Sequence, residues 1–284
     1  MAVDLHIHTN VSDGVYSPAE VVEQALQASL EAIAITDHDI IDGVIMAQNA
    51  ATGANIEIIP GIELSAAYKQ KDVHILGYYM DLTNSEFLDH LSVIRNVRKN
   101  RVISIIEKLF ALGIKLDLNE IVQDADNTVI CRSHVARAMV ASGAVKTKKE
   151  AFKRYIGLGK SAYVPRETIS PPEAIHLILV ARGVPVLAHP GSEHNNANFI
   201  KELINVGLKG IEVYHREHDA KQTKMYTKIA QQNGLIMTGG SDFHGSRSEY
   251  NHPIGSFSVG YQTVEELKKL ASFHNNVAYS RKHS

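Results

Sequence analysis

The sequence predicts an α/β fold in which strands and helices alternate along most of the chain. Short apolar runs, such as Ala-Ile-Ala-Ile at 32–35, alternate with amphipathic segments, which is typical of βα units and of a parallel sheet or barrel. The alternation stops over residues 86–158, where the pattern is helical throughout, and it resumes after 159. These observations predict one α/β domain with an inserted helical subdomain.

The first predicted strand, at 3–8, leads into a helix that begins after Ser17. Pro18 follows at the first helical position, and Glu20 lies three residues after the Ser, which is the signature of a capping box. This helix is expected to reach about residue 30. The elements expected next are a strand at 32–36, a helix at 44–51, a strand at 56–60, and a hairpin that pairs 63–68 antiparallel with 73–80 through the polar turn 69–72.

The insertion and the second half of the chain complete the predicted elements. Within the insertion, helices are expected at 93–112, 118–125, 133–142 and 148–156. The βα rhythm then returns with a helix that opens at Ser170, followed by Pro171 and by Glu173. Further on we expect a strand at 185–188, a helix at 198–206, a strand at 210–214, a helix from about 221 to 233 that stops at Gly234, and a strand at 235–238.

Composition excludes several classes of protein. The 284 residues are 44% hydrophobic and 21% charged, which is ordinary for a globular protein with a substantial core. A formal charge of −2 argues against coating nucleic acid by bulk electrostatics, so any polyanion contact must be local and no stable DNA complex is expected. The single cysteine, Cys131, excludes an intrachain disulfide and a thiolate zinc knuckle. Without a membrane-length apolar stretch or a leader after Met1, we expect a soluble, cytoplasmic protein.

Metal-binding side chains recur where the predicted strands end. They occupy six short windows: 4–8 (DLHIH), 36–38 (TDH), 61–63 (GIE), 73–75 (VHI), 188–190 (AHP) and 241–244 (SDFH). Imidazoles and carboxylates are costly to bury unless they are paired or bind a metal. A polynuclear divalent-metal site explains all six windows by one cause, and the carboxyl ends of barrel strands are where active sites form. The pattern therefore predicts a metal-dependent hydrolase.

Each of these motifs is weak evidence when taken alone. Residues two apart in a strand point to the same face, so His6 and His8 can reach one metal together. Asp13, in the segment Ser-Asp-Gly, is equally compatible with an ordinary turn. Asp242 and His244 repeat the two-apart spacing after the last predicted strand, which would adjoin the first strand if the barrel closes.

Together the motifs closely resemble the PHP (polymerase and histidinol phosphatase) superfamily. The similar segments are 6–9 (HIHT), 12–14 (SDG), 35–39 (ITDHD), 61–63 (GIE), 74–77 (HILG), 188–191 (AHPG) and 240–244 (GSDFH). They span essentially the whole chain and are most similar to stand-alone PHP phosphoesterases that carry a helical insertion. This resemblance implies a distorted (β/α)7 PHP barrel built from 1–85 and 159–284, with 86–158 as an inserted helical subdomain that caps the substrate.

The resemblance also implies the ligands of a centre with two or three divalent metal ions. One ion would be held by His6, His8, Glu63 and Asp242, a second by Asp13, His38 and His244, and a third, where it is bound, by His74, His189 and Glu63. Many PHP proteins have histidine at the position of Asp13, but the nucleotide-cleaving branch is similar to this chain in having aspartate. Mixed imidazole and carboxylate ligands suit Mn, Fe or Zn. A hydroxide that bridges two metals is the expected nucleophile, with Glu63 and Asp242 as candidate catalytic residues.

Cations in the predicted insertion suit a phosphorylated substrate. Arg95, Arg98 and Arg101 recur at three-residue spacing on one predicted helix, and Arg132 and His134 begin another. The planar guanidinium of arginine binds phosphate well, although arginine on an exposed helix is often only a solvated face. Given the resemblance, Arg98, Arg101, Arg132 and His134 are the candidate substrate-binding residues. His134 is also a candidate proton donor to the leaving oxygen.

The substrate implied by the resemblance is a small nucleotide, such as a nucleoside 3',5'-bisphosphate, or the 5' end of a short RNA. One alternative is a phosphomonoesterase like histidinol phosphatase. Another is an amidohydrolase that attacks a C–N bond, since His-x-His on a first barrel strand with a late Asp occurs there too; the arginine-rich insertion does not favour it. A non-catalytic metal-binding module is a third alternative, against which the complete ligand set argues.

Overall fold

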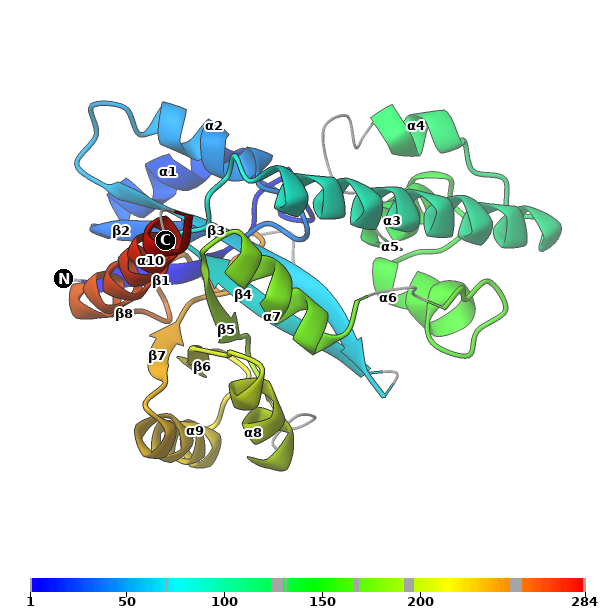
Figure 1. The fold of residues 1–284 in the computed structure, drawn as a ribbon. Helices are drawn as coiled ribbons and strands as arrows, with labels where there is room; N and C mark the ends of the chain where they lie inside the picture. The colour runs from blue at the N-terminus through cyan, green and yellow to red at the C-terminus, as the bar shows by residue number, and fades with distance from the viewer. Residues whose placement is uncertain are drawn as a thin grey trace.

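The computed structural model describes residues 2–69, 71–123, 130, 132–165, 169–191, 197–245 and 252–282. Within these ranges the chain forms a nearly closed barrel of strands surrounded by helices, and a group of helices projects from one side of it (Figure 1). The predicted α/β barrel with a helical insertion is therefore confirmed. None of the helices in these ranges has both the length and the hydropathy that crossing a bilayer requires.

The barrel is built from segments on both sides of the insertion. The segment before it contains β1 (Ala2–Ile7), α1 (Pro18–Gln27), β2 (Ala32–Ile35), α2 (Asp42–Ala50), β3 (Glu57–Tyr68) and β4 (Lys71–Tyr78). The segment after it contains α7 (Pro171–Val180), β5 (Val184–Leu187), α8 (Ala197–Asn205), β6 (Gly210–Tyr214), α9 (Ala220–Asn233), β7 (Ile236–Gly239), β8 (Val259–Gly260) and α10 (Tyr261–Lys282).

The described strands form one sheet in the order β7-β6-β5-β4-β3-β2-β1-β8. Neighbouring strands are parallel except around β4, which pairs antiparallel with both β3 and β5, and at β8, which pairs antiparallel with β1. The predicted β3–β4 hairpin is confirmed, with Glu63 opposite Leu76. The expectation of two separate strands at 56–60 and 63–68 is wrong: β3 runs unbroken through Pro60 because an extended backbone accommodates the proline φ angle.

The two ends of the sheet meet where the chain leaves β7. The backbone N–H of His8 donates to the Phe243 carbonyl over 2.9 Å, and Ile7 and Phe243 form a parallel bridge. A side chain at Gly240 would lie 2.4 Å from the His6 backbone nitrogen, so this close approach requires glycine. The contact predicted between the first strand and the segment after the last is confirmed.

Helix boundaries follow the capping signals. Capping boxes are present at Ser17 with Glu20 and at Ser170 with Glu173, as the sequence predicts. The predicted helix stop at Gly234 is also confirmed, since this residue is left-handed with φ 63°. The helix α10 was not predicted; its apolar side chains Val264 and Leu267 pack against the inner face of the barrel strands.

The insertion contains α3 (Ser85–Ala111), α4 (Leu118–Gln123), α5 (Arg132–Ala141), α6 (Lys148–Ala151) and the single π-helical turn η1 (Phe152–Ile156). The expected helix start at residue 93 is wrong. Asn84 accepts a hydrogen bond from the Phe87 N–H over 2.9 Å and caps the helix there, and Phe87 and Leu91 pack in a cluster with apolar side chains of β3, β4 and α7. The end of the helix expected at 118–125 and Cys131 lie outside the described residues.

The long helix α3 belongs to two hydrophobic cores. Its first half packs on the barrel, whereas Val102, Ile105 and Leu109 in its second half pack with α5 and η1 in a separate cluster. Figure 1 shows α3 extending from the barrel to the group formed by α4, α5 and α6. The exact subdomain limits at 86–158 stay a prediction.

Glu57 connects α10 to the barrel and allows a test of this packing. Its carboxylate accepts hydrogen bonds from Tyr79, Tyr261 and Lys268 over 2.6–2.9 Å. Burial alone would raise the pKa of Glu57, but these three donors lower it. A depressed pKa in the folded state stabilises the fold above the unfolded pKa, and this contribution disappears as the pH falls through the folded pKa.

We expect Glu57→Gln to lower the free energy of unfolding at pH 7 by about 1 kcal/mol, because the cluster is partly exposed to solvent. Urea melts at pH 7 and near pH 4 measure the effect, and the difference from wild type should shrink at the lower pH. Glu265→Gln, at an exposed site on the same helix, is the control. A variant as stable as wild type at pH 7 would contradict the prediction.

Candidate metal centre and active site

The nine candidate metal ligands converge inside the barrel. Three of them lie on strands: His6 on β1, Glu63 on β3 and His74 on β4. The others follow strands: His8 and Asp13 follow β1, His38 follows β2, His189 follows β5, and Asp242 and His244 follow β7. The two-apart spacing brings the rings of His6 and His8 to one side, with their Nε2 atoms 3.2 Å apart. Glu63 and His74 depart from the expected position at strand ends because the β3–β4 hairpin continues beyond them.

The Glu63 carboxylate lies at the middle of this arrangement and is only 1% exposed. Its Oε1 is 2.8 Å from His74 Nδ1 and 3.1 Å from His189 Nε2. Its Oε2 is 3.1 Å from His8 Nε2, 3.2 Å from His38 Nδ1 and 3.4 Å from His6 Nε2. One buried carboxylate therefore faces five imidazoles that reach it from four different segments.

Two further carboxylates complete the candidate ligand set. Asp242 Oδ1 is 3.2 Å from His8 Nε2 and 3.4 Å from His244 Nδ1. Asp13 Oδ1 is 3.2 Å from His244 Nε2. The candidate ligands form overlapping groups in which the ligand atoms lie within 4.8 Å of one another. Three of these groups are His8 with Asp13, His38 and His244; His6 with His8 and Glu63; and His38 with Glu63 and His74.

This donor set fits divalent metal ions. The His8 Nδ1 atom is buried and has no hydrogen-bond partner among the described residues, and it lies 3.8 Å from Asp13 Oδ1. A buried ring nitrogen without a partner is costly unless something binds it. A divalent ion at this position would satisfy it, and mixed nitrogen and oxygen donors are those that Mn, Fe and Zn accept.

The electrostatics of the ligands are strongly coupled. Burial opposes protonation of His8, but hydrogen bonds to Asp242 and Glu63 raise its pKa to about 10. Burial lowers the pKa of His38 to about 3. Burial would raise the pKa of Glu63, but His74, His38 and His6 hold it well below its usual value. Carboxylates thus keep protons on some of the imidazoles in the metal-free chain, and a bound metal would take the place of those protons.

Two charged residues that contact the ligands were not predicted from the sequence. Glu212 on β6 is fully buried, accepts the His189 backbone N–H over 2.8 Å, and lies 3.1 Å from His6 Nδ1. A carboxylate on the second ring nitrogen of a metal-binding histidine fixes its tautomer and orientation. Arg216 donates to Asp242 Oδ2 over 2.8 Å. The signal for Glu212 was a glutamate in the middle of a predicted barrel strand, since a buried glutamate is rare without a partner.

Another buried carboxylate, that of Asp37, holds the loop that carries Asp13. Asp37 accepts hydrogen bonds from the Thr9 N–H and hydroxyl over 2.8 and 2.7 Å and from the Ser12 hydroxyl over 2.6 Å. These bonds tie the segment after β1 to the segment after β2. Asp13 and His38 are therefore held at one side of the cluster by the same loop contacts.

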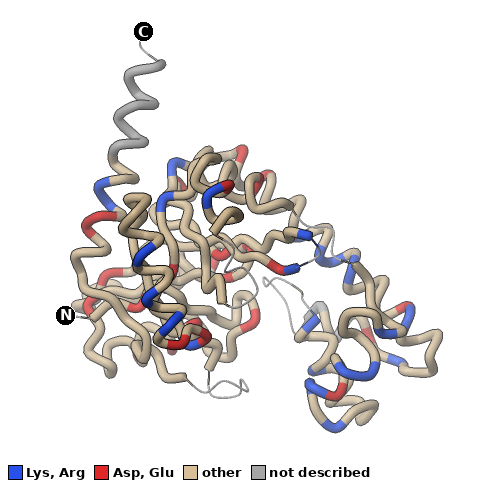
Figure 2. Tube along the Cα trace, turned by 90° about the horizontal axis from the view of Figure 1, so that it is seen from below, with Lys and Arg blue, Asp and Glu red and all other residues tan. Residues whose placement is uncertain are grey.

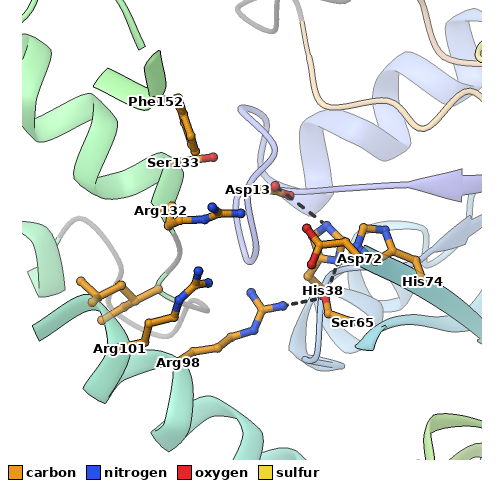
Figure 3. A pocket seen from close by; sticks show the side chains of 12 residues that line it. Asp13, His38, Ser65, Asp72, His74, Arg98, Arg101, Arg132, Ser133 and Phe152 are labelled. Carbon is orange, nitrogen blue, oxygen red and sulfur yellow. Dashed lines mark hydrogen bonds and ion pairs between the residues drawn. The ribbon is translucent and has the colours of Figure 1, made fainter. Parts of the chain in front are cut away.

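A cavity of about 180 Å³ opens between the candidate metal ligands and the insertion (Figure 3). Its walls include Asp13, His38, Ser65, Asp72 and His74 from the barrel, and Arg98, Arg101, Val102, Ile130, Arg132, Ser133 and Phe152 from the insertion. Figure 3 shows the three arginines pointing from the insertion toward Asp13 and the two histidines. The cavity thus has ligand candidates on one side and cations on the other.

The predicted substrate-binding residues differ in their surroundings. Arg98 donates to the Ser65 hydroxyl over 2.7 Å and forms an ion pair with the buried carboxylate of Asp39. Arg101 donates to the Val164 carbonyl over 3.0 Å, and burial together with the neighbouring Arg132 lowers its pKa to about 10. The Arg132 guanidinium lies over the Phe152 ring at 5.6 Å. His134 is 2% exposed and, unlike its neighbours Arg132 and Ser133, is not part of the cavity lining.

Several known proteins are similar to this chain over most of its length. A 5'-3' exoribonuclease of Haemophilus influenzae is 35% identical over 85% of this chain and 89% of that protein. A 3',5'-nucleoside bisphosphate phosphatase of Chromobacterium violaceum is 34% identical over 85% of this chain and 87% of that protein. The crystal structure of a candidate metal-dependent phosphoesterase from Bifidobacterium adolescentis has a TM-score of 0.86 at 30% identity, covering 94% of this chain and 96% of that one.

The fold, the clustered ligands and these relatives define a metal-dependent hydrolase that acts on phosphoric esters. The PHP domain model matches residues 4–182, and the chain belongs to the PHP family. The family resemblance that the sequence motifs indicated is thereby confirmed.

Glu63 offers the sharpest test of the cluster. Because its carboxylate faces five imidazoles, we expect Glu63→Gln to reduce bound metal and to lower kcat/KM at least about 100-fold. Metal content after dialysis and steady-state kinetics measure the two effects. Glu23→Gln, on the exposed face of α1, should change neither. Wild-type metal content in Glu63→Gln would contradict the central position of this carboxylate.

Proposed function

We propose that the chain hydrolyses phosphate esters of small nucleotides, such as nucleoside 3',5'-bisphosphates, or of the 5' ends of short RNAs. The observation that carries the proposal is the cavity, in which Arg98, Arg101 and Arg132 face Asp13, His38 and His74. A substrate that is anionic at its reacting end fits between cations and a metal cluster. The names of the two relatives given above supply the nucleotide classes.

The proposed metal assignment follows the ligand groups. His6, His8, Glu63 and Asp242 would hold one divalent ion, Asp13, His38 and His244 a second, and His74, His189 and Glu63 a third, with Mn, Fe or Zn as the candidate elements. When bound, such ions supply Lewis acidity and an activated water at neutral pH. Glu63 and Asp242 are the proposed catalytic carboxylates, since each lies within reach of more than one group of ligands.

The residues of the chain itself would bind and orient the substrate. Arg101 and Arg132 are the proposed phosphate contacts, and partial burial of Arg101 strengthens its interaction with an anion. Arg98, which holds Ser65 and Asp39, is the third proposed contact. A role for His134 as a substrate contact and proton donor requires α5 to close on the bound substrate, since a donor must come within hydrogen-bond reach of the leaving oxygen.

The proposal includes a reducing, cytoplasmic location, which the presence of a single cysteine, Cys131, supports. Its partner is the phosphorylated substrate, and we propose neither membrane attachment nor a stable DNA complex. A formal charge of −2 over the whole chain supports the last point.

A substrate panel tests the proposed function. Metal-loaded protein is incubated with adenosine 3',5'-bisphosphate, 5'-phosphorylated short RNA, p-nitrophenyl phosphate, histidinol phosphate and a set of amides. We expect release of phosphate or nucleotides from the first two at the highest kcat/KM, loss of that activity on chelation with EDTA, and its return with Mn²⁺. Preference for histidinol phosphate would replace the nucleotide assignment, and turnover of amides alone would overturn phosphoester hydrolysis.

Two variants separate substrate capture from metal binding. We expect Arg132→Ala to lower kcat/KM about 10- to 100-fold, mainly through KM, because a charge-assisted phosphate contact is worth about 1.5–3 kcal/mol. We expect His8→Ala to lose both metal and turnover. Arg95→Ala serves as the control on α3, since Arg95 is 42% exposed and pairs with Asp42 instead of lining the cavity. Wild-type rates in His8→Ala would count directly against the proposed site.

A further inference from the structure

Positive charge is concentrated in one part of the insertion. Residues 132–165 contain eight Lys or Arg and one Asp or Glu, which gives a formal charge of +7. The remaining 250 residues contain 21 Lys or Arg and 30 Asp or Glu, which gives a formal charge of −9. A chain with an overall charge of −2 thus combines one strongly basic segment with a remainder, including the barrel, α3 and α4, that is acidic as a whole. Such segregation creates a local field that a polyanion can use.

Most of this charge lies at the surface. The exposed cations of the segment, here called the cationic surface, are Lys146, Lys148, Lys149, Lys153, Arg154 and Lys160. The one acidic residue, Glu150, pairs with Arg154 over 2.5 Å. Figure 2 shows Lys and Arg outnumbering Asp and Glu over the projecting helices. Like charges this close in sequence repel one another, so folding alone gives no reason to collect them here.

The cationic surface belongs to the same chain segment as part of the cavity lining. Arg132 and Phe152, which line the cavity, belong to the same segment, and the exposed Lys153 follows Phe152 directly. The helices α5, α6 and η1 pack on one another and bury apolar side chains in a shared cluster. Phe152 opens a π-helical turn, a rare element that is frequent at functional sites.

Aromatic rings are interleaved with the cations. Phe152 lies under Arg132, Tyr155 under Arg154 and Tyr163 under Arg101, at 5.0–5.9 Å from ring centroid to guanidinium. Basic residues that follow the phosphates, together with aromatic rings on which bases stack, are the usual means of binding single strands without sequence preference.

The size of the cavity completes the argument. At about 180 Å³ it is smaller than the 300 Å³ or so at the lower end of small-molecule sites. It can therefore hold the phosphorylated end of a substrate, while most of an oligonucleotide must lie outside. On the insertion side, the segment that supplies Arg132 and Phe152 to the cavity lining also carries the cationic surface.

We infer that the cationic surface binds the phosphodiester backbone of short single-stranded RNA whose 5' end occupies the cavity. This inference rests on the proposed function and deepens it, because it makes an RNA of several nucleotides a better substrate than a mononucleotide. Each lysine that contacts a phosphate releases counterions, so binding weakens with salt with a log–log slope of about −0.7 per contact on a single strand.

The test is a triple charge reversal, Lys148→Glu, Lys149→Glu and Lys153→Glu, with the neutral Lys→Gln triple as a milder companion. The matched control reverses Lys221, Lys224 and Lys228, exposed residues on α9, which Figure 1 shows well separated from α6. The kcat/KM values are measured for adenosine 3',5'-bisphosphate and for a 5'-phosphorylated RNA of ten nucleotides between 50 and 200 mM salt. Binding of the same RNA, labelled at its 3' end, is measured separately by anisotropy in EDTA.

We expect the reversal to lower kcat/KM for the RNA at least about tenfold at 50 mM salt and to reduce the salt slope by about 2, with the mononucleotide unchanged within twofold. The neutral triple should give a smaller loss in the same direction, and the α9 control should lose neither activity. Equal losses on both substrates, or equal losses in the α9 control, would overturn the inference.

The binding arm separates this inference from the proposed function. RNA that binds in EDTA and is released by the reversal would support the cationic surface, and it would overturn the proposed function if metal-loaded protein hydrolyses neither this RNA nor adenosine 3',5'-bisphosphate. RNA hydrolysed equally well by wild type and by a folded triple variant would overturn the cationic surface and leave the proposed function standing.

Discussion

The buried carboxylate of Glu63 is the constraint on which the rest of the site depends. An ionised carboxylate at 1% exposure is tolerated only if opposite charge or a metal compensates for lost hydration. The fold meets that requirement with five imidazoles from the segments of β1, β2, β4 and β5. The antiparallel hairpin, the close approach at Gly240 and the near-closure of the barrel all serve to bring these rings to one carboxylate.

Charge changes sign from the barrel to the insertion, and the cavity lies at that boundary. Its barrel wall presents Asp13 and the histidines, whereas its insertion wall presents Arg98, Arg101 and Arg132. The ion pair between Arg98 and Asp39, together with the Arg98 bond to Ser65, ties α3 to the loop after β2 and to β3. The insertion is therefore placed by the same segments that carry His38 and Glu63, so a substrate held by its arginines reaches the cluster.

Local signals in the sequence predicted much of the fold and of the site. Strand spacing indicated that His6 and His8 act together, and capping residues located the starts of α1 and α7. Contacts set by the tertiary fold were beyond prediction: the pairing of Arg98 with Asp39, the salt bridge of Arg216 to Asp242, and the burial of His134. The early start of α3 was missed although Asn84 is a local capping signal for it, and α10 was missed although its packing with the barrel strands helps to stabilise it.

The most direct test of the account is a crystal structure of the manganese-loaded protein with anomalous diffraction recorded. We predict at least two anomalous peaks inside the barrel, one of them within coordination distance, about 2.0–2.3 Å, of both a Glu63 oxygen and the Nε2 atom of His6 or His8. A second peak should lie among Asp13, His38 and His244. Imidazoles turned away from Glu63, with no anomalous peak beside that carboxylate, would contradict the account.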